Sequence, residues 1–454
     1  MRRTITNLVL VLVLVLLAAM PAMAAPDPQV GVNVVLKGDI TAEDLAALGQ
    51  FGQVQQQLPA IDAVILRARA SQLEAIRALP SVAAASLDAP RSAGPTSTLP
   101  VADFADGLST WNLDAINVTD FGFGNRMVAQ TGEGVYVAVL DTGLVRDWRN
   151  VFPEERIAVE YARSFGGGAN ENANVSEQPN KWERDVNSHG THVTSTILGY
   201  ALNGTPVAGV APLARVIPVK VLNQNGSGWS SVIAQGIVYI ADLKAGPLQN
   251  APVVINMSLG GPELDAVEKA AIDYAVSKGV IIVAAAGNEG MAGMGYPGAY
   301  EPVISVAAAG FTWQWVVGPW WYAIDDPEPN DAANYFIGDF SSRAWPGQDL
   351  DVTAPGVSVV GPYKVNNGNE MTYYFLGGTS MASPHVAGIV ALMAEKNPAL
   401  TAGQAEAILE GTALPLPPAC RVVGSPAGAQ EYCWEANATG AGLALADQAL
   451  MATP

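Results

Sequence analysis

The 454-residue sequence has few of the side chains that bind metals or carry redox chemistry, with only two cysteines and three histidines. Two cysteines are too few for a cysteine-rich zinc site. Basic residues are also scarce: 23 Lys and Arg stand against 42 Asp and Glu, and the formal net charge is −19. A nucleic-acid-binding protein needs a basic surface, so we expect no nucleic-acid partner. Since half the residues are apolar, the chain can form a compact globular body of two or three units.

Long apolar runs are absent after the first 24 residues. No later stretch of about 18 residues is free of charges and of Gly or Pro, so we expect no stable membrane anchor in the mature protein. Residues 1–24 contain two early arginines, an apolar run over 8–19, and Ala22 and Ala24 in an A-x-A arrangement. This layout predicts a secretory signal peptide, with a membrane anchor as the alternative. We therefore expect a secreted, extracellular protein.

The two cysteines, Cys420 and Cys433, lie close together near the end of the sequence. Export would allow a disulfide between them, closing a short loop. The alternative is two unpaired thiols.

Residues 30–90 alternate short strand and helix patterns in the order β-α-β-β-α-β, which is typical of a small ferredoxin-like α+β unit. The stretch that follows, DAPRSAGPTSTLP over residues 88–100, is rich in Pro, Ser and Thr and predicts a flexible, cleavable linker. We place the small unit at residues 25–95 and the linker at 96–110.

Beyond residue 130 the pattern changes to near-continuous apolar strands separated by helical segments. Strands without polar alternation predict an α/β domain with a mostly parallel, doubly wound sheet covered on both faces. Sites in such folds gather at the carboxyl ends of the strands. Asp141, Ser258 and Asn288 follow three of these strands.

Residues 311–340 do not fit this alternation. The segment carries four of the ten tryptophans and then runs into an acidic stretch broken by prolines. It predicts either a hydrophobic flap packed on the body or an exposed surface that binds substrate.

Three motifs supply an acid, a base and a nucleophile. VAVLDTGL places Asp141 at the end of a buried strand, NSHGTHV places His189 at a helix start, and GGTSMASPHVAG places Ser380 just before a helix. Serine becomes a good nucleophile when a base takes its proton, and histidine titrates near neutral pH. A buried aspartate can hold the imidazole in the required tautomer.

The pair His189 and His192 also fits a metal site, because histidines three apart share one helix face. A metallohydrolase built on them would lack an HExxH arrangement and a third ligand nearby. We therefore expect His192 to be a packed structural residue.

Together, and in the order Asp, His, Ser, the three motifs resemble those of the subtilisin-like serine protease family over roughly residues 110–450. The resemblance implies a catalytic domain at residues 111–454 that hydrolyses peptide bonds through an acyl-enzyme on Ser380, with no cofactor needed for the chemistry. Asn288 in AAAGNEG matches the asparagine that donates to the oxyanion. The alternative is a non-catalytic binding protein on a protease fold.

The same resemblance implies a peptide-binding cleft for protein or peptide substrates. Its two walls match NGSGWS and SLGG, and they contain Gly226, Ser227, Gly228, Ser258, Leu259 and Gly260. Peptide would bind as an added strand between the walls. Glycines at 260 and 295 leave room, so we expect a preference for a large apolar residue before the scissile bond.

Residues 25–95 resemble, by pattern and position, the propeptide of the family. This implies an intramolecular inhibitor and folding aid that is removed by a cut within residues 88–100, in a protein that is a monomer. A permanently attached accessory domain is the alternative.

The family resemblance also implies a structural Ca²⁺ site. Its ligands would be carbonyls in YPGAYEPV and carboxylates in QDLDV, namely Gly298, Tyr300, Val303, Asp349 and Asp351. Oxygen ligands of this kind suit a hard cation.

Overall fold

The computed structural model describes residues 27–101, 110–120, 125–170, 177–202, 205–316, 320–321, 330–365 and 370–454. The predicted signal peptide lies outside these residues, as do parts of the predicted linker and of the insertion at 311–340.

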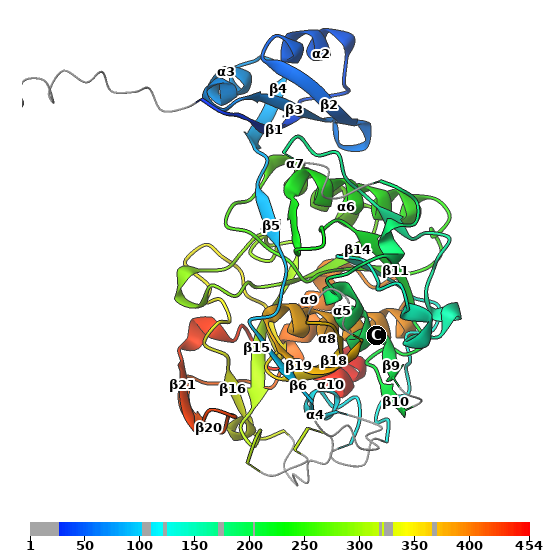
Figure 1. Cartoon of the computed structure of the whole chain (residues 1–454), viewed down its shortest axis with the longest axis vertical. Helices are drawn as coiled ribbons and strands as arrows, with labels where there is room; N and C mark the ends of the chain where they lie inside the picture. Colours follow the sequence, from blue (N-terminus) through cyan, green and yellow to red (C-terminus); the bar gives the residue numbers. More distant parts are fainter. Residues whose placement is uncertain are drawn as a thin grey trace, which may run out of the picture.

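The N-terminal unit is a four-stranded antiparallel sheet in the order β2-β3-β1-β4. This is the ferredoxin-like order that the β-α-β-β-α-β pattern predicts. Thr41 caps the first helix by accepting a hydrogen bond from the amide of Asp44 at 3.1 Å. The elements are β1 (Gln29–Leu36), α2 (Ala42–Gly49), β2 (Gly52–Leu58), β3 (Ala63–Arg69), α3 (Leu73–Arg77) and β4 (Val82–Leu87). In Figure 1 this unit lies at one end of the molecule, next to α6 and α7.

The segment after this unit forms two short paired strands, where the sequence predicts a flexible linker. β5 (Pro90–Ser92) pairs antiparallel with β12 (Ser227–Trp229), and β6 (Ser97–Pro100) pairs antiparallel with β19 (Thr372–Gly377). Figure 1 shows β5 running from the N-terminal unit along the larger body. Its partners lie more than 100 residues away in sequence, so the local composition of Pro, Ser and Thr does not reveal the pairing.

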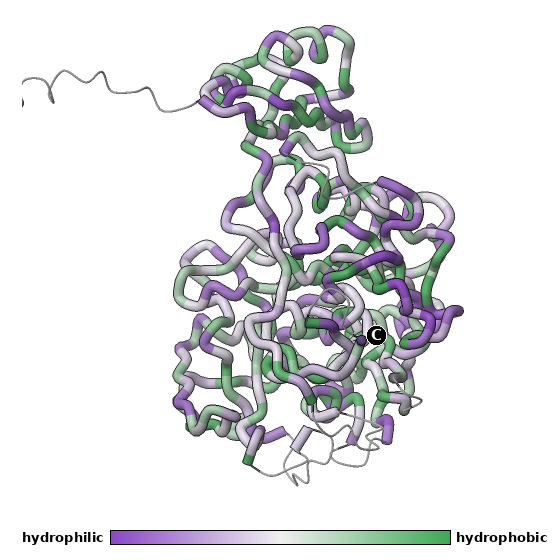
Figure 2. Tube along the Cα trace, viewed as in Figure 1, coloured by the Kyte–Doolittle hydropathy of each residue, from purple (hydrophilic) through white to green (hydrophobic). Residues whose placement is uncertain are grey.

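The larger body is built on an eight-stranded sheet in the order β16-β15-β14-β13-β7-β11-β8, with β17 also paired to β15. All these pairs are parallel except that of β15 with β16. The strands are β7 (Tyr136–Asp141), β8 (Arg163–Ser164), β11 (Arg215–Lys220), β13 (Val253–Met257), β14 (Val280–Ala285), β15 (Ile304–Phe311), β16 (Tyr335–Ile337) and β17 (Val352–Pro355). The hydropathy colouring of Figure 2 marks apolar segments in the interior of this body.

Helices cover both faces of the sheet, which confirms the predicted doubly wound α/β class. Alternate residues of β7 point to opposite cores: Val137 packs in the core with α5 (His189–Leu198) and α8 (Thr379–Lys396). Ala138 packs in the core with α6 (Ser230–Ala245) and α7 (Ala266–Ser277). The carboxyl end of β7 is thereby brought beside the first turns of α5 and α8.

The remaining described elements lie around this frame. They are α4 (Trp111–Ala115), β9 (Gly199–Leu202), β10 (Thr205–Ala208), β18 (Val359–Tyr363), α9 (Ala402–Thr412), β20 (Ala419–Val423), β21 (Gln430–Trp434) and α10 (Ala446–Ala452), with short 3-10 turns between. Within the described part of the chain, no helix is both long and apolar enough to cross a membrane.

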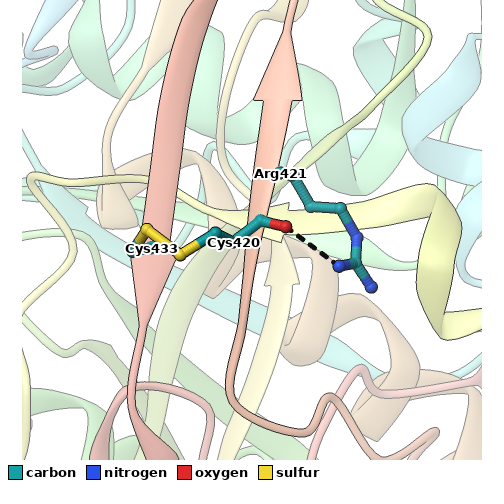
Figure 3. The surroundings of a disulfide bond; sticks show 3 residues. All are labelled: Cys420, Arg421 and Cys433. Atoms are coloured by element: carbon teal, nitrogen blue, oxygen red, sulfur yellow. Dashed lines mark hydrogen bonds between the residues drawn. A yellow bond between two sulfur atoms is a disulfide. The ribbon is translucent and has the colours of Figure 1, made fainter.

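A disulfide joins Cys420 and Cys433, as predicted. The two residues lie opposite each other on the antiparallel hairpin of β20 and β21 (Figure 3). Arg421 donates a hydrogen bond from its guanidinium to the carbonyl of Cys420 at 3.0 Å.

The described part of the tryptophan-rich insertion packs on the body. Trp315, Trp320 and Trp321 surround Phe375 of β19, with ring centroids 4.9, 5.3 and 6.3 Å from it. Trp313 is 53% exposed. Three of the four tryptophans therefore support the strand that leads into α8.

Candidate active site

Asp141 and His189 form a buried hydrogen-bonded pair at the carboxyl end of β7. Nδ1 of His189 lies 2.8 Å from Oδ1 and 2.9 Å from Oδ2 of Asp141, and neither side chain is exposed. The carboxylate accepts the Nδ1 proton, which leaves Nε2 as the nitrogen that can take a proton from a nucleophile.

A polar support holds the first turn of α5, where His189 lies. The carboxylate of Asp185 accepts from the amide of Ser188 at 2.8 Å and from the hydroxyl of Thr142 at 2.7 Å. Thr142 in turn accepts from the amide of Gly190 at 3.0 Å. A Cβ at Gly190 would lie 2.3 Å from a backbone carbonyl, so only glycine allows this close approach of α5 to β7. Burial raises the pKa of Asp185, and the nearby Lys220 opposes the rise.

Ser380 lies in the first turn of α8 and is 2% exposed. Its hydroxyl donates to the carbonyl of Ser258 at 3.2 Å, and Ser258 donates its own hydroxyl to the carbonyl of Ser380 at 2.8 Å. Nε2 of His189 is buried and has no hydrogen-bond partner among the described residues. The structure thus brings the acid and the base into contact, while the serine hydroxyl is turned toward Ser258.

Asn288 follows β14 and lines the same cavity of about 240 Å³ as Ser380. Its side-chain oxygen accepts from both the amide and the hydroxyl of Thr379, each at 2.9 Å. These bonds fix the orientation of the amide and leave its NH₂ group to donate elsewhere. A fixed donor beside a serine is the arrangement that stabilises a developing oxyanion.

A groove beside Ser380 has the two predicted walls, and residues 90–93 run between them. Ser92 exchanges two hydrogen bonds of 2.9 Å with Gly260 on one wall, and its other neighbour in register is Ser227. Ala93 donates its amide to the carbonyl of Gly226 at 2.8 Å. Five of the six predicted cleft residues, Gly226, Ser227, Gly228, Leu259 and Gly260, therefore lie around an extended strand of the same chain, whereas Ser258 is buried and bonded to Ser380.

The chain continues past Ser380 without a break. Thr96 donates its amide to the carbonyl of Gly377 at 2.6 Å, on the far side of Ser380. Gly94 and Pro95 lie between these fixed points and line the cavity that also contains Ser380. Because the Gly94–Pro95 bond lies midway between the fixed residues 93 and 96, this placement points to it as the peptide bond presented to Ser380.

Comparison with known proteins identifies this arrangement. The profile of the subtilase family matches residues 132–443. The chain belongs to the subtilase family. It is 38% identical over 286 residues to subtilisin DY of Bacillus licheniformis, covering 62% of this chain and 84% of that protein. It is 31% identical over 420 residues to a thermostable alkaline protease of Halalkalibacterium halodurans, covering 91% of this chain and 94% of that protein.

Solved structures agree with the fold. Fervidolysin from Fervidobacterium pennivorans, described as a keratinolytic enzyme related to subtilisin, has a TM-score of 0.64 at 23% identity, covering 96% of this chain and 63% of its own. Sphericase has a TM-score of 0.52 at 29% identity, covering 75% of this chain and 99% of its own. Membership of the subtilase family implies serine protease activity.

The other two histidines of this subtilase are buried structural residues. Burial lowers the pKa of His192 to about 3 and that of His385 to about 4, so both are neutral. His385 accepts from the side-chain amide of Asn112 at 2.7 Å. Among the described residues, no histidine belongs to a cluster of three or more side chains that could hold a metal. This arrangement argues against the metallohydrolase alternative.

A carboxylate cluster contains two of the predicted cation ligands and one residue that the sequence did not suggest. Asp349 and Asp351 lie with Glu406 of α9, and their carboxylate oxygens are within 4.8 Å of one another. Among the described residues, Oδ1 of Asp351 is buried and has no hydrogen-bond partner, while Oδ2 accepts from the amide of Ser305 at 2.6 Å. Burial, reinforced by the neighbouring acids, raises the pKa values of Asp351 and Glu406 to about 7.

The predicted carbonyl ligands Gly298, Tyr300 and Val303 lie on the segment that carries Glu301, and the charge of Glu301 acts on Glu406. The three carboxylates fit a hard cation, because their oxygens converge and one buried carboxylate oxygen has no hydrogen-bond partner in the described part of the chain.

Two supporting residues had no role in the sequence prediction. Asp185 precedes His189 by four residues, and an acid there that caps the coming helix turn is a signal that could have been found. Glu406 is about 55 residues away from the QDLDV motif, so only the packing of α9 reveals its place.

Proposed function

We propose that this subtilase is a secreted serine endopeptidase that uses Ser380 as nucleophile, His189 as general base, Asp141 as the orienting acid and Asn288 as an oxyanion donor. The observation that carries the proposal is an extended strand lying across Ser380, between the two walls of the groove. A groove that holds a peptide backbone by main-chain hydrogen bonds on both sides of a serine can present any extended segment to it.

We further propose that residues 25–95 are a propeptide that inhibits the enzyme until it is cut away. The N-terminal unit docks on the first turns of α6 and α7 through polar contacts. Asp88 accepts from the amide of Ser231 at 3.0 Å, and Asp265 accepts from the side-chain amide of Asn33 at 2.9 Å. The segment that follows then fills the groove. The chain as a whole would be a monomer exported by its signal peptide at 1–24.

Pro95 gives a physical reason for slow self-cleavage at this register. Proline has no N–H, and its ring replaces the hydrogen on the nitrogen that would leave. His189 must reach that nitrogen to donate its proton when the bond breaks. The residue before a proline is also restricted in conformation. The segment therefore combines good binding with a poor scissile bond.

Pro95→Ala is expected to speed conversion of the precursor, because the bond beside Ser380 becomes an ordinary secondary amide. The purified precursor and the variant would be followed over time by mass spectrometry of the new N-terminus and by casein hydrolysis. A cut within residues 88–100 and a coincident rise of activity are expected. Equal conversion rates would contradict the role of Pro95, and a precursor as active as the processed form would contradict inhibition.

The preference before the scissile bond would be for a large apolar residue. Gly94 has no side chain, and the cavity beside it is lined by Leu259, Gly260, Ala285 and Gly295, together with the polar residues Asn288 and Glu289. An apolar side chain bound in this cavity would be transferred from water to an apolar surface, and this transfer favours binding.

Ca²⁺ is proposed to bind at Asp349, Asp351 and Glu406, with the carbonyls of residues 298, 300 and 303. When bound, the ion would supply charge balance and rigidity rather than catalysis.

Excess CaCl₂ in place of EDTA is expected to raise the Tm of the processed protein by about 5 °C at a pH where the carboxylates are ionised. Glu406→Gln should lose most of this response. Glu410→Gln, one turn further along the same helix, should keep it. A Tm that is the same in CaCl₂ and EDTA would show that no such ion is held.

The alternative of a non-catalytic binding protein would require a missing catalytic group. Asp141, His189, Ser380 and Asn288 are all present at the groove, so the endopeptidase is the better-supported function.

A further inference from the structure

A buried ion pair holds the strand in the groove at a position that a substrate side chain would also occupy. Nε of Arg91 donates to Oε1 of Glu268 at 3.1 Å, and Nη2 donates to Oε2 of the same carboxylate. Neither side chain is exposed. Arg91 belongs to the segment 90–95, and Glu268 belongs to α7 of the catalytic body.

The pocket around the guanidinium is built for its shape. Nη2 of Arg91 also donates to the main-chain carbonyl of Glu263 at 2.8 Å. A Cβ at Gly261 would lie 2.8 Å from Nη1 and 2.2 Å from the carbonyl of Pro90, so a side chain there would collide with the bound strand. The planar fork of arginine, held by two bonds to one carboxylate and a third to a carbonyl, is a geometry that lysine cannot reproduce.

The register places Arg91 at a definite distance from the bond to be cut. Arg91 pairs with Gly228, Ser92 with Ser227, and Gly94 precedes the bond beside Ser380. Counting back from Gly94, Arg91 is the fourth residue before that bond.

Once the N-terminal segment has left, the pocket keeps its negative groups and loses its cation. Burial raises the pKa of Glu268, and the ion pair with Arg91 opposes this rise. Asp265 remains nearby as the cap of α7, accepting from the amides of residues 267 and 268. An apolar side chain bound here would leave a buried carboxylate without a partner, which costs binding free energy.

We propose that Glu268 is a specificity-determining residue that selects arginine as the fourth residue before the scissile bond. The proposal rests on the endopeptidase function above and names its substrate class: extended peptides with arginine at that position and an apolar residue at the bond. Arg91 would then be the chain's own substitute for a substrate arginine.

The test compares tetrapeptide p-nitroanilides on the processed wild-type enzyme. The series is acetyl-X-Ser-Ala-Leu-p-nitroanilide, with X as Arg, Lys, citrulline or Leu. Citrulline keeps the shape of arginine and removes the charge. We expect kcat/KM for Arg to exceed that for Leu and for citrulline by on the order of 100-fold, with Lys between. Equal kcat/KM values across the series would overturn the proposal and leave Glu268 as a contact of the propeptide alone.

The variant Glu268→Gln should reduce the preference for Arg over Leu to within a few-fold, because kcat/KM for the Arg peptide falls while that for the Leu peptide rises. Asp273→Asn removes an equal charge from the exposed side of the same helix and should keep the preference. Because the Glu268→Gln protein could fail to fold, the peptide series measured on the wild-type enzyme is sufficient by itself to test the proposal. Hydrolysis of casein with no preference would refute only the subsite, whereas no hydrolysis of casein or of any peptide would refute the endopeptidase itself.

Discussion

Ser380→Ala is expected to lower kcat for peptide hydrolysis by about 10⁶-fold, a magnitude taken from the equivalent change in subtilisin itself. The change removes the oxygen that would form the acyl-enzyme and leaves the binding groove in place. The same variant should accumulate as an uncut precursor, because the strand across the nucleophile could no longer be cleaved by its own molecule. Casein and p-nitroanilide assays would measure the first effect, and gel electrophoresis the second.

Ser383→Ala is the matched control for this variant. Ser383 lies one turn further along α8, is buried, and donates its hydroxyl to the side-chain carbonyl of Asn256 at 2.7 Å. It should lower stability by about 1–3 kcal/mol through the unpaired acceptor and keep most of the activity. A Ser380→Ala enzyme that hydrolyses peptides at the wild-type rate would refute the assigned nucleophile.

Asp141→Asn is expected to lower kcat by about 10⁴-fold, as the corresponding aspartate substitutions in serine proteases do. The carboxylate lies within 2.9 Å of Nδ1 of His189 through both of its oxygens. An asparagine can present its NH₂ group to that nitrogen, which would place the imidazole proton on Nε2 and prevent it from accepting the proton of Ser380. Steady-state kinetics on an unblocked, processed sample would measure the loss.

Asp185→Asn is the control for Asp141→Asn. It shows whether the loss of kcat is specific to Asp141 or follows the removal of any nearby buried carboxylate. Asp185 accepts from the amides of Asn187 and Ser188 in the turn before His189, whereas Asp141 is the carboxylate bonded to the ring. We expect the variant to lower the Tm while kcat of the folded enzyme stays within about tenfold of the wild type. Should Asp185→Asn lose as much kcat as Asp141→Asn, the assignment of Asp141 as the orienting acid would be wrong.

The parallel sheet and its cover of helices could be predicted from the sequence because the signal is local. Near-continuous apolar runs such as GVIIVAAAG leave no polar face, so the strands must be buried on both sides. The same reasoning placed Asp141 and Asn288 at strand ends, where the structure brings them to one edge of the sheet. The ferredoxin-like order of the N-terminal unit followed from the β-α-β-β-α-β order of its short strand and helix patterns.

The pairing of the segment 88–100 with the larger body was not foreseen in the sequence prediction. Its Pro, Gly and Ser content is typical of a linker, yet residues 90–92 pair with β12 and residues 97–100 pair with β19. A strand that is added to the edge of another domain is held extended by hydrogen bonds to its partner strands. Its own composition therefore says little about whether it forms a strand. The pairing of Arg91 with Glu268 and the place of Glu406 are likewise set by tertiary packing, which no local pattern reports.

The central claim is that Ser380 is an activated nucleophile whose access the chain's own segment 90–100 blocks. A fluorophosphonate probe, which reacts covalently with activated serines, tests it most directly when combined with peptide mass mapping. We expect rapid labelling of Ser380 in the processed protein, slow labelling in the intact precursor and none in Ser380→Ala. Labelling of the intact precursor at the processed rate, or labelling of a different serine, would contradict the account.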